Sequence, residues 1–250
     1  MPASPLAAAA RPIESESVDP GRSVAWWSEA WTLFLRSPLR WVLLGAALML
    51  GFGLLAMVPW AGALAAALLS PVVVGGWMLA AHRVHGGDAL DALRLFAGLR
   101  GRHLKPLLIL GAALAAATLL MAVVDRALGV SALAGAVSID APGDAAAQAA
   151  LHHSMLALLL LLAFSIVVTA ALWFAPALVV LRGATPWQAA HASLRAVRDN
   201  GLTFLLYGVV QLLLLAPATS LPYQLGWLVL VPLMLLTAYV SYREVFEGPA

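Results

Sequence analysis

Six long apolar stretches constrain this chain more than any other feature of its sequence. A helix needs about 20 apolar residues to cross the hydrocarbon core of a bilayer. Six stretches approach that length, at residues 40–59, 62–82, 105–124, 154–181, 201–217 and 222–242. No charged residue lies at the centre of any of them. We therefore expect an all-α, polytopic membrane bundle of six transmembrane helices.

Composition excludes the main alternatives to a membrane protein. Hydrophobic residues make up 63% of the 250 residues and charged residues only 10%, whereas soluble domains contain about 45–50% and about 25% respectively. The polar surface is too small to cover a water-soluble core, and the chain is too apolar to be disordered. The absence of cysteine excludes a disulfide scaffold, thiol catalysis and iron–sulfur clusters, and we expect no cofactor.

The basic residues indicate how the chain is oriented. Thirteen of the 14 Lys and Arg residues lie before the first span, in the connections after the second and fourth spans, or at the end of the sixth span. We assign these regions to one side of the membrane. Only Arg126 lies elsewhere. Because positively charged connections stay in the cytoplasm, this predicts a multi-pass protein of the bacterial inner membrane with both termini cytoplasmic. Residues 1–22 lack the pattern of a signal peptide and are expected to form a disordered cytoplasmic tail before a membrane domain at 23–244. The long connection at 125–153 would face outward and be irregular or partly helical.

A short amphipathic stretch precedes each pair of spans. Their apolar stripes recur at helical spacing and consist of Val24, Trp27, Trp31 and Phe34, then Leu90, Leu93 and Phe96, then Trp187, Ala190, Leu194 and Val197. Such stretches favour helices that lie in the cytoplasmic interface of the membrane. The third begins with Thr185, Pro186 and Gln188, a pattern typical of a capping box. The order of helix, span and span occurs three times, which fits either parallel repeats or the ordinary hydropathy of hairpin proteins.

Basic side chains beside the second and third stretches are candidates for binding anionic lipid headgroups. They are Arg94, Arg100, Arg102, Lys105, Arg195 and Arg198. All are predicted at one membrane face, while the spans carry no central charge. We therefore expect a protein that interacts with lipid or anchors other molecules. Its partners would be the phospholipid bilayer, anionic headgroups, and another protein or a second copy of the chain; basic residues are too scattered for nucleic acid.

A small-solute or lipid transporter is the alternative interpretation. Pro71, Pro176 and Pro232 each lie in the second span of a pair, and Gln211 is the costliest polar residue within a span. Transporter sites use broken helices and polar groups at mid-membrane. Proline is nevertheless common in membrane helices, and a buried glutamine often bonds a neighbouring helix. Ser70, Thr118, Ser165 and Thr169 are the other polar candidates.

Catalytic and metal-binding patterns are weak. The sequence contains neither G-x-S-x-G nor H-E-x-x-H, and no acidic residue lies in the middle of a span. His82, His85 and Asp88 are spaced like ligands on one helix face, but Gly86 and Gly87 interrupt that helix. We therefore expect no enzymatic activity and no metal site.

Two segments carry a resemblance to a known group. They are Trp173–Leu178 (WFAPAL) and the stretch from Thr185 to Asn200, with Thr185–Ala189 (TPWQA), Ser193, Arg198 and Asn200. In these residues the chain resembles an uncharacterised family of proteobacterial six-span inner-membrane proteins. That family is distantly similar to the membrane-anchoring domain of some glycerophosphodiester phosphodiesterases. The resemblance implies a polytopic inner-membrane protein and supplies no catalytic residues.

The predicted topology is testable with reporter fusions. Fusions at residues 60, 140 and 220 should report the outer side of the membrane, and fusions at 95, 192 and 250 the cytoplasmic side, because basic residues flank only the latter positions. Paired phosphatase and fluorescent-protein reporters measure the two sides independently. Fusions at 60 and 95 that report the same side would contradict the prediction.

Overall fold

The computed structural model describes residues 13–90, 101–128, 145–222 and 225–248, with the side chains of 145–154 excepted. The elements within these ranges are α-helices, and they confirm the predicted all-α class. They are α1 (Arg22–Leu35), α2 (Pro38–Ala56), α3 (Ala61–His85), α5 (Leu104–Leu128), α7 (Ala145–Trp173), α8 (Ala175–Arg182), α9 (Pro186–Asp199), α10 (Gly201–Ser220) and α11 (Trp227–Glu247).

Six helical segments within the described residues are long and apolar enough to cross a membrane. They are α2, α3, α5, the α7–α8 segment from Met155 to Arg182, α10 and α11. Each corresponds to one predicted span, so the chain is a multi-pass membrane protein. Several helices outrun the apolar stretch that predicted them. For example, α5 continues to Leu128, because backbone hydrogen bonding does not stop where the side chains become polar.

The last hairpin corrects the predicted boundaries. The fifth span was expected to end at Pro217, but α10 contains Pro217 and runs on to Ser220. The sixth was expected at 222–242, but α11 begins at Trp227 and continues to Glu247. Proline needs no N–H partner, and a helix accommodates it where the lost bond is near an end. Because α11 continues to Glu247, its final turns include the charged residues Arg243, Glu244 and Glu247.

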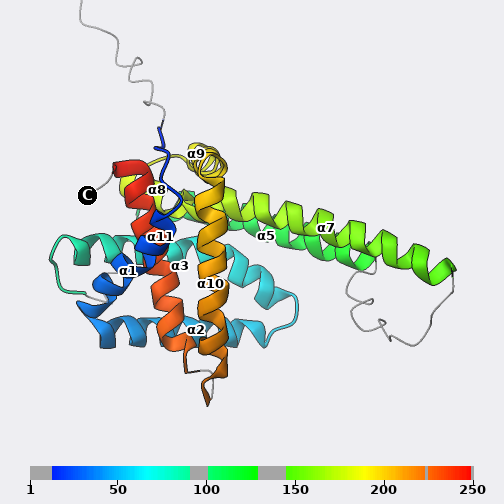
Figure 1. The fold of residues 1–250 in the computed structure, drawn as a ribbon, viewed down its shortest axis with the longest axis horizontal. Coiled ribbons are helices and arrows are strands. Elements are labelled where there is room, and N and C mark those ends of the chain that lie inside the picture. The colour runs from blue at the N-terminus through cyan, green and yellow to red at the C-terminus, as the bar shows by residue number, and fades with distance from the viewer. Residues whose placement is uncertain (1–12, 91–100, 129–144, 223–224, 249–250) are drawn as a thin grey trace, which may run out of the picture.

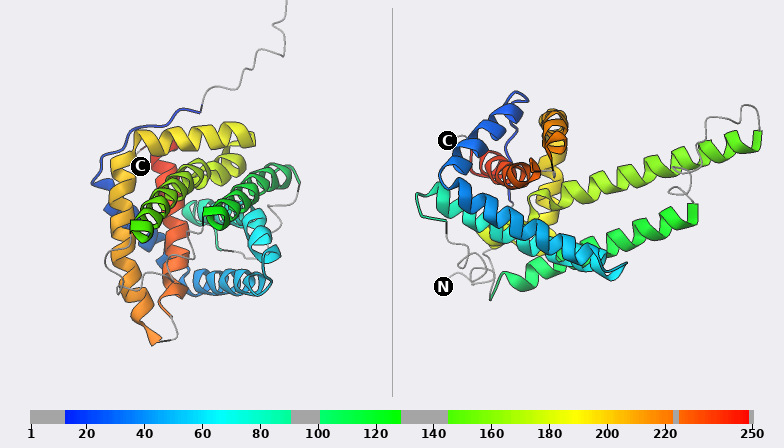
Figure 2. Two further views of the ribbon diagram at one scale, coloured as in Figure 1. Left: turned by 90° about the vertical axis from the view of Figure 1, so that its right-hand side faces the viewer. Right: turned by 90° about the horizontal axis from the view of Figure 1, so that it is seen from below.

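The helices run in two directions (Figures 1 and 2). α2, α3, α5 and α7 lie roughly along one direction, and α10 and α11 run crosswise to them. α5 and α7 extend together beyond the other helices as a long arm. The third pair of spans is thus oriented differently from the first two.

α11 lies at the centre of the packed core. In its most apolar stretch 61% of the residues are buried, against 11–39% for the other five spans. It packs against α1, α2, α3 and α10. Its side chains Leu236, Tyr239 and Tyr242 are fully buried, as are Trp41 of α2 and Trp77 of α3. The outer spans leave most of their apolar surface exposed, as expected for surface that faces lipid.

Glycine allows the closest helix contacts. A Cβ placed on Gly111 of α5 would lie 2.0 Å from the backbone oxygen of Leu68 in α3. A Cβ on Gly62 would meet the backbone oxygen of Leu55 in the neighbouring helix of its hairpin. Close packing at both positions therefore depends on the absence of a side chain.

The first amphipathic stretch forms α1, and the face that it buries in the protein coincides only in part with the predicted apolar stripe. Trp27 and Phe34 are buried as expected, whereas Val24 and Trp31 are 59% and 44% exposed. Trp26, which the predicted stripe omitted, is fully buried. α1 packs against both α10 and α11, so its buried face is wider than a single interfacial stripe. Most of the second predicted stretch, 91–100, lies outside the described residues.

The third amphipathic stretch forms α9, and the capping box at its start is confirmed by reciprocal bonds between Thr185 and Gln188. Trp187 of the predicted apolar stripe is 74% exposed and does not pack into the protein core. The other three residues of that stripe, Ala190, Leu194 and Val197, are only half-buried. The fully buried face instead consists of small residues, namely Ala189, Ala192, Ser193 and Ala196. Small side chains let α9 approach α7 closely, and this contact outweighs the hydrophobicity of the larger residues.

The α3–α5 contact yields a stability prediction. Gly111→Ala should lower the thermal unfolding midpoint of the detergent-purified protein, because the new Cβ meets backbone that has no room to move. Gly208→Ala is the matched control, since a Cβ there meets nothing within 4 Å. That variant should be neutral or stabilised by up to about 1 kcal/mol through helix propensity. Equal effects of the two substitutions would contradict the assigned packing.

Candidate functional site

An apolar cavity of about 290 Å³ lies where five helices meet. Its lining comes from α3 (Ser70, Pro71, Val74), α5 (Leu114), α7 (Val168, Thr169, Leu172, Trp173), α8 (Pro176) and α11 (Met234, Leu235, Ala238). None of these residues carries a charge. The size approaches the lower end of ordinary small-molecule pockets. The lining therefore suits an uncharged, apolar group such as part of a lipid chain.

The cavity lining includes few polar side chains, namely those of Ser70, Thr169 and Trp173. The Ser70 hydroxyl donates to the backbone oxygen of Ala67 at 3.3 Å, one turn earlier in its own helix. Thr169 is exposed on α7. The Trp173 indole Nε1 is buried and has no hydrogen-bond partner. A few polar groups on an otherwise apolar wall are typical of small-molecule pockets.

The break between α7 and α8 shapes one wall of the cavity. Pro176 lacks an N–H and its ring clashes with the carbonyl one turn earlier, so α7 ends and α8 begins there. The Ser193 hydroxyl of α9 donates to Ala170 O at 2.6 Å and accepts from Phe174 N–H at 2.9 Å. These two backbone groups would bond each other in an uninterrupted α-helix. Ser193 thus satisfies both at the break.

The structure brings together only part of the predicted transporter pathway. Pro71 and Pro176 both line the cavity. Pro232 instead packs against α2, where a Cβ on Gly45 would lie 2.7 Å from its Cγ. The Gln211 amide lies 3.9 Å from the sulfur of the lining residue Met234, but Gln211 itself does not line the cavity. The other two predicted polar residues, Thr118 and Ser165, bond to backbone oxygens of their own helices.

A second apolar cavity, of about 260 Å³, lies between α2 and α3. It is lined by leucine, alanine, glycine and phenylalanine side chains with Val73 and Trp77. Two helices alone form it, and no break in either helix shapes it. The five-helix cavity is therefore the better candidate for a specific site.

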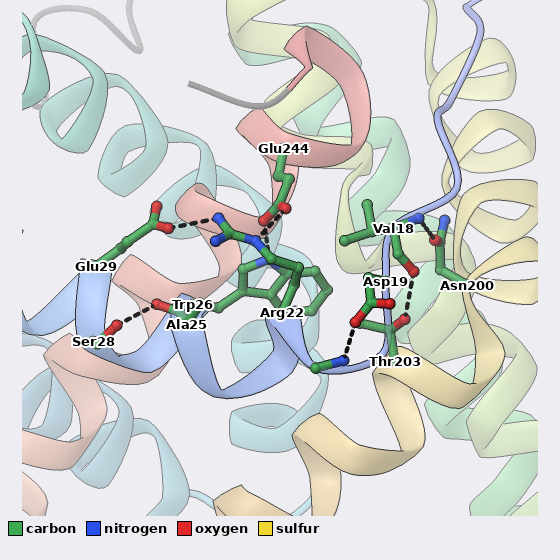
Figure 3. A network of polar contacts seen from close by, with 11 residues as sticks. Val18, Asp19, Arg22, Ala25, Trp26, Ser28, Glu29, Asn200, Thr203 and Glu244 are labelled. Carbon is green, nitrogen blue, oxygen red and sulfur yellow. Dashed lines mark hydrogen bonds and ion pairs between the residues drawn. The ribbon is translucent and has the colours of Figure 1, made fainter.

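A polar network joins α1 to the end of α11 (Figure 3). Arg22 Nε donates to Glu244 Oε1 at 2.6 Å, and the indole N–H of Trp26 donates to Glu244 Oε2 at 2.6 Å. Arg22 also contacts Glu29 at 2.7 Å. The hydrogen bond to Glu244 holds the pKa of the Arg22 guanidinium above its ordinary value. The sequence interpretation missed Glu244, although an acidic residue at the end of a predicted span was its available signal.

The segment before α1 is fastened across α10 and α11. Val18 N–H donates to the Asn200 side-chain oxygen at 2.6 Å, and the Asn200 amide donates back to Glu16 O at 3.1 Å. Thr203 donates to Val18 O, and Glu16 N–H donates to Val245 O at 2.8 Å. Asn200 is therefore the centre of a long-range contact. The first and last described parts of the chain lie at the same end of the molecule.

The candidate headgroup-binding residues are exposed wherever they are described. Arg102, Lys105, Arg195 and Arg198 are exposed, on or beside the start of α5 and on α9, two helices in contact with each other. Arg198 forms an ion pair with Asp199 at 3.0 Å, at a site too exposed for the pair to add much stability. The two remaining candidates, Arg94 and Arg100, lie outside the described residues.

Other arginines serve the ends of helices, a role that the sequence did not reveal. Arg36 donates to Val84 O at 2.9 Å and to His85 O at 3.1 Å, at the C-terminus of α3. Arg182 donates to Phe246 O, at the C-terminus of α11. The last carbonyls of a helix have no partner within the helix and carry partial negative charge. These arginines supply the missing hydrogen-bond donors and place positive charge next to the partial negative charge of the helix ends.

Within the described parts of the chain, no three or more histidine or acidic residues group closely enough to hold a metal ion. α3 ends at His85, and Gly87 adopts a left-handed φ of 97°, so Asp88 leaves the helix face that the two histidines share.

Comparison with known proteins finds no matching family, curated protein or solved structure. The resemblance to the six-span family stays a prediction.

The network around Glu244 predicts unequal effects of two similar substitutions. Glu244→Ala should cost about 2 kcal/mol or more of unfolding free energy, because it removes charged hydrogen bonds from Arg22 and a buried indole. Glu29→Ala should cost less than about 1 kcal/mol, because this ion pair is exposed. Denaturant or thermal unfolding in detergent measures both. A cost for Glu29→Ala as large as that for Glu244→Ala would contradict this assignment.

Proposed function

We propose that this chain is a non-enzymatic inner-membrane protein that binds membrane lipid and holds one lipid chain in its five-helix cavity. The observation that carries the proposal is the apolar, uncharged lining of that cavity at the α7–α8 break. Lipid chains and the cavity wall are equally apolar, so the fit of shapes rather than the hydrophobic effect would select the occupant. Binding of this kind suits an anchoring or organising role.

The proposed orientation has both termini in the cytoplasm. The Glu16 N–H donates to Val245 O, and this contact supports the proposal that both ends of the membrane domain lie on one side, as expected for an even number of spans. Basic side chains near these ends include Arg22, Arg182 and Arg243. Positive charge favours the cytoplasmic side, which supports a cytoplasmic assignment for this end in a bacterial inner membrane.

The exposed basic residues of α5 and α9 would add contacts with anionic headgroups at the same face. Each basic side chain near such a surface contributes about 1 kcal/mol of attraction. The exposed side chains that would contribute to this attraction are those of Arg102, Lys105, Arg195 and Arg198. We propose the same role for Arg94 and Arg100. The partners would then be the bilayer itself and, through the same face, a protein or a second copy of the chain.

A non-enzymatic role is supported by the chemistry of the cavity wall. A hydrolytic site needs a nucleophile beside a base, or paired acids. The cavity lining includes no histidine, aspartate or glutamate, and the Ser70 hydroxyl bonds to its own helix. The wall therefore offers surface for binding and little for proton transfer.

Lipid transport is the second candidate function. The specific observation in its favour is that Pro71 and Pro176, from different helices, line one cavity. A helix break beside a cavity is a common feature of transporters. Translocation of a fluorescent phospholipid in reconstituted vesicles separates the two roles, because a binding protein retains lipid without moving it between leaflets.

Filling the cavity tests the proposed binding. Thr169→Trp should remove tightly held phospholipid from the detergent-purified protein, because the indole would occupy the space available to a chain. Thr118→Trp is the matched control, since Thr118 lies on α5 and does not line the cavity. Mass spectrometry of extracted lipid measures the amount per protein. Equal lipid in both variants and the unsubstituted protein would refute the proposed cavity occupant.

A further inference from the structure

Arginine and histidine side chains from three elements converge at the C-terminal end of α3. His82 and His85 lie one turn apart on α3, and the ring of Tyr239 from α11 packs against both, with centroid separations of 6.2 and 6.1 Å. His82 Nδ1 lies 3.3 Å from the Tyr239 hydroxyl. Arg243 Nη1 lies 3.4 Å from His85 Nδ1. We name this group, together with Arg36, the α3-end cluster.

The cluster carries excess positive charge. Arg36 approaches from the α1–α2 junction and bonds to the last carbonyls of α3. Glu247 faces Arg243 at 3.6 Å, which is long for a charge-assisted hydrogen bond. Arg36 and Arg243 contribute two positive charges and Glu247 one negative charge, a formal charge of +1 with both histidines neutral. Gathering like charges in this way favours binding of an anion.

The exposed residues beside the cluster indicate how deep it lies in the membrane. Leu35 and Leu39 flank Arg36 in sequence and are 54% and 69% exposed. Leu35 ends α1 and Leu39 lies in the first turn of the candidate span α2, so their exposed side chains suit contact with lipid chains. The cluster therefore lies at the depth where apolar side chains give way to basic ones, which is where lipid phosphates lie.

We propose that the α3-end cluster binds the phosphate of an anionic phospholipid headgroup. Arg243 supplies a planar fork of N–H donors that matches phosphate oxygens. His85 and His82 supply additional ring N–H donors, and Arg36 adds charge from the facing element. The ligand class is a glycerophospholipid with net negative charge, as distinct from zwitterionic lipid.

The same two helices connect this cluster to the five-helix cavity. Val74 lines the cavity and lies two helical turns before His82 on α3, and Ala238 lines it directly before Tyr239 on α11. Two turns correspond to about 11 Å along a helix. The proposal rests on the proposed lipid binding and names its headgroup. A chain in the cavity and a phosphate at the cluster would lie along one seam.

Native mass spectrometry of the full-length protein in detergent tests the cluster directly. Phosphatidylglycerol and phosphatidylcholine are titrated separately against the protein. The double variant Arg243→Gln with His85→Gln should weaken phosphatidylglycerol binding roughly tenfold or more, as expected for loss of charge-assisted hydrogen bonds. Phosphatidylcholine binding should change little. The matched control is Arg126→Gln, which removes an arginine that lies over the Trp60 ring at the other end of the spans.

A conservative variant keeps the test decisive if the double variant does not fold. Arg243→Lys preserves the charge but removes the fork, and it should reduce the preference for phosphatidylglycerol by less than the double variant. Unchanged phosphatidylglycerol affinity in folded double variant, or in Arg243→Lys where the double variant is unfolded, would overturn the proposal. Displacement of phosphatidylglycerol from the unsubstituted protein by inorganic phosphate would also overturn it, because the site would then take free phosphate.

The outcomes separate this proposal from the proposed function. Equal and weak binding of both lipids by the unsubstituted protein would refute lipid binding as a whole. Tight phosphatidylglycerol binding that is insensitive to the cluster variants would refute only the cluster. Thr169→Trp, which fills the cavity, should lower the amount of bound lipid while the preference for phosphatidylglycerol over phosphatidylcholine persists.

Discussion

Hydrocarbon offers no hydrogen bonds, so every backbone group within the membrane must find its partner inside the protein. Six apolar helices meet this requirement along most of their length. Where a helix is interrupted, a side chain must substitute. Ser193 does so at the α7–α8 break, where its hydroxyl bridges Ala170 O and Phe174 N–H. The break can therefore persist beside the cavity without leaving polar backbone unpaired.

The same requirement explains the placement of several arginines. α3 and α11 both end on the side that we propose to be cytoplasmic, and their last carbonyls lack helical partners. Arg36 and Arg182 reach these carbonyls from neighbouring elements. Positive charge at this end thus has two effects, since it favours cytoplasmic retention and completes the hydrogen bonding of the helices. Arg243 does not bond to a helix end and instead faces His85 and Glu247.

Much of the fold follows from hydropathy and local chemistry. The six spans and the capping box at Thr185 were both predictable, because each depends on a short, local pattern. The buried face of α9 was not, since packing of small residues against α7 outweighs the hydrophobicity of Trp187. The roles of Asn200 and Glu244 also escaped prediction, because their partners lie about 180 and 220 residues away in the chain and no local pattern encodes such contacts. Of the predicted pathway residues, Pro71 and Pro176 meet at the cavity, while Pro232 meets α2 because Gly45 leaves room for its ring.

The central claim is that a lipid chain occupies the five-helix cavity, and photo-crosslinking of protein extracted from native membranes tests it most directly. A benzophenone amino acid at position 172 would lie on the cavity wall, and one at position 160 would lie on the exposed surface of the same helix. Samples are irradiated after detergent extraction and analysed by mass spectrometry. We predict a phospholipid adduct at position 172, formed with lipid retained through extraction, and none at position 160. Adducts restricted to detergent or to neighbouring helices at position 172 would contradict it.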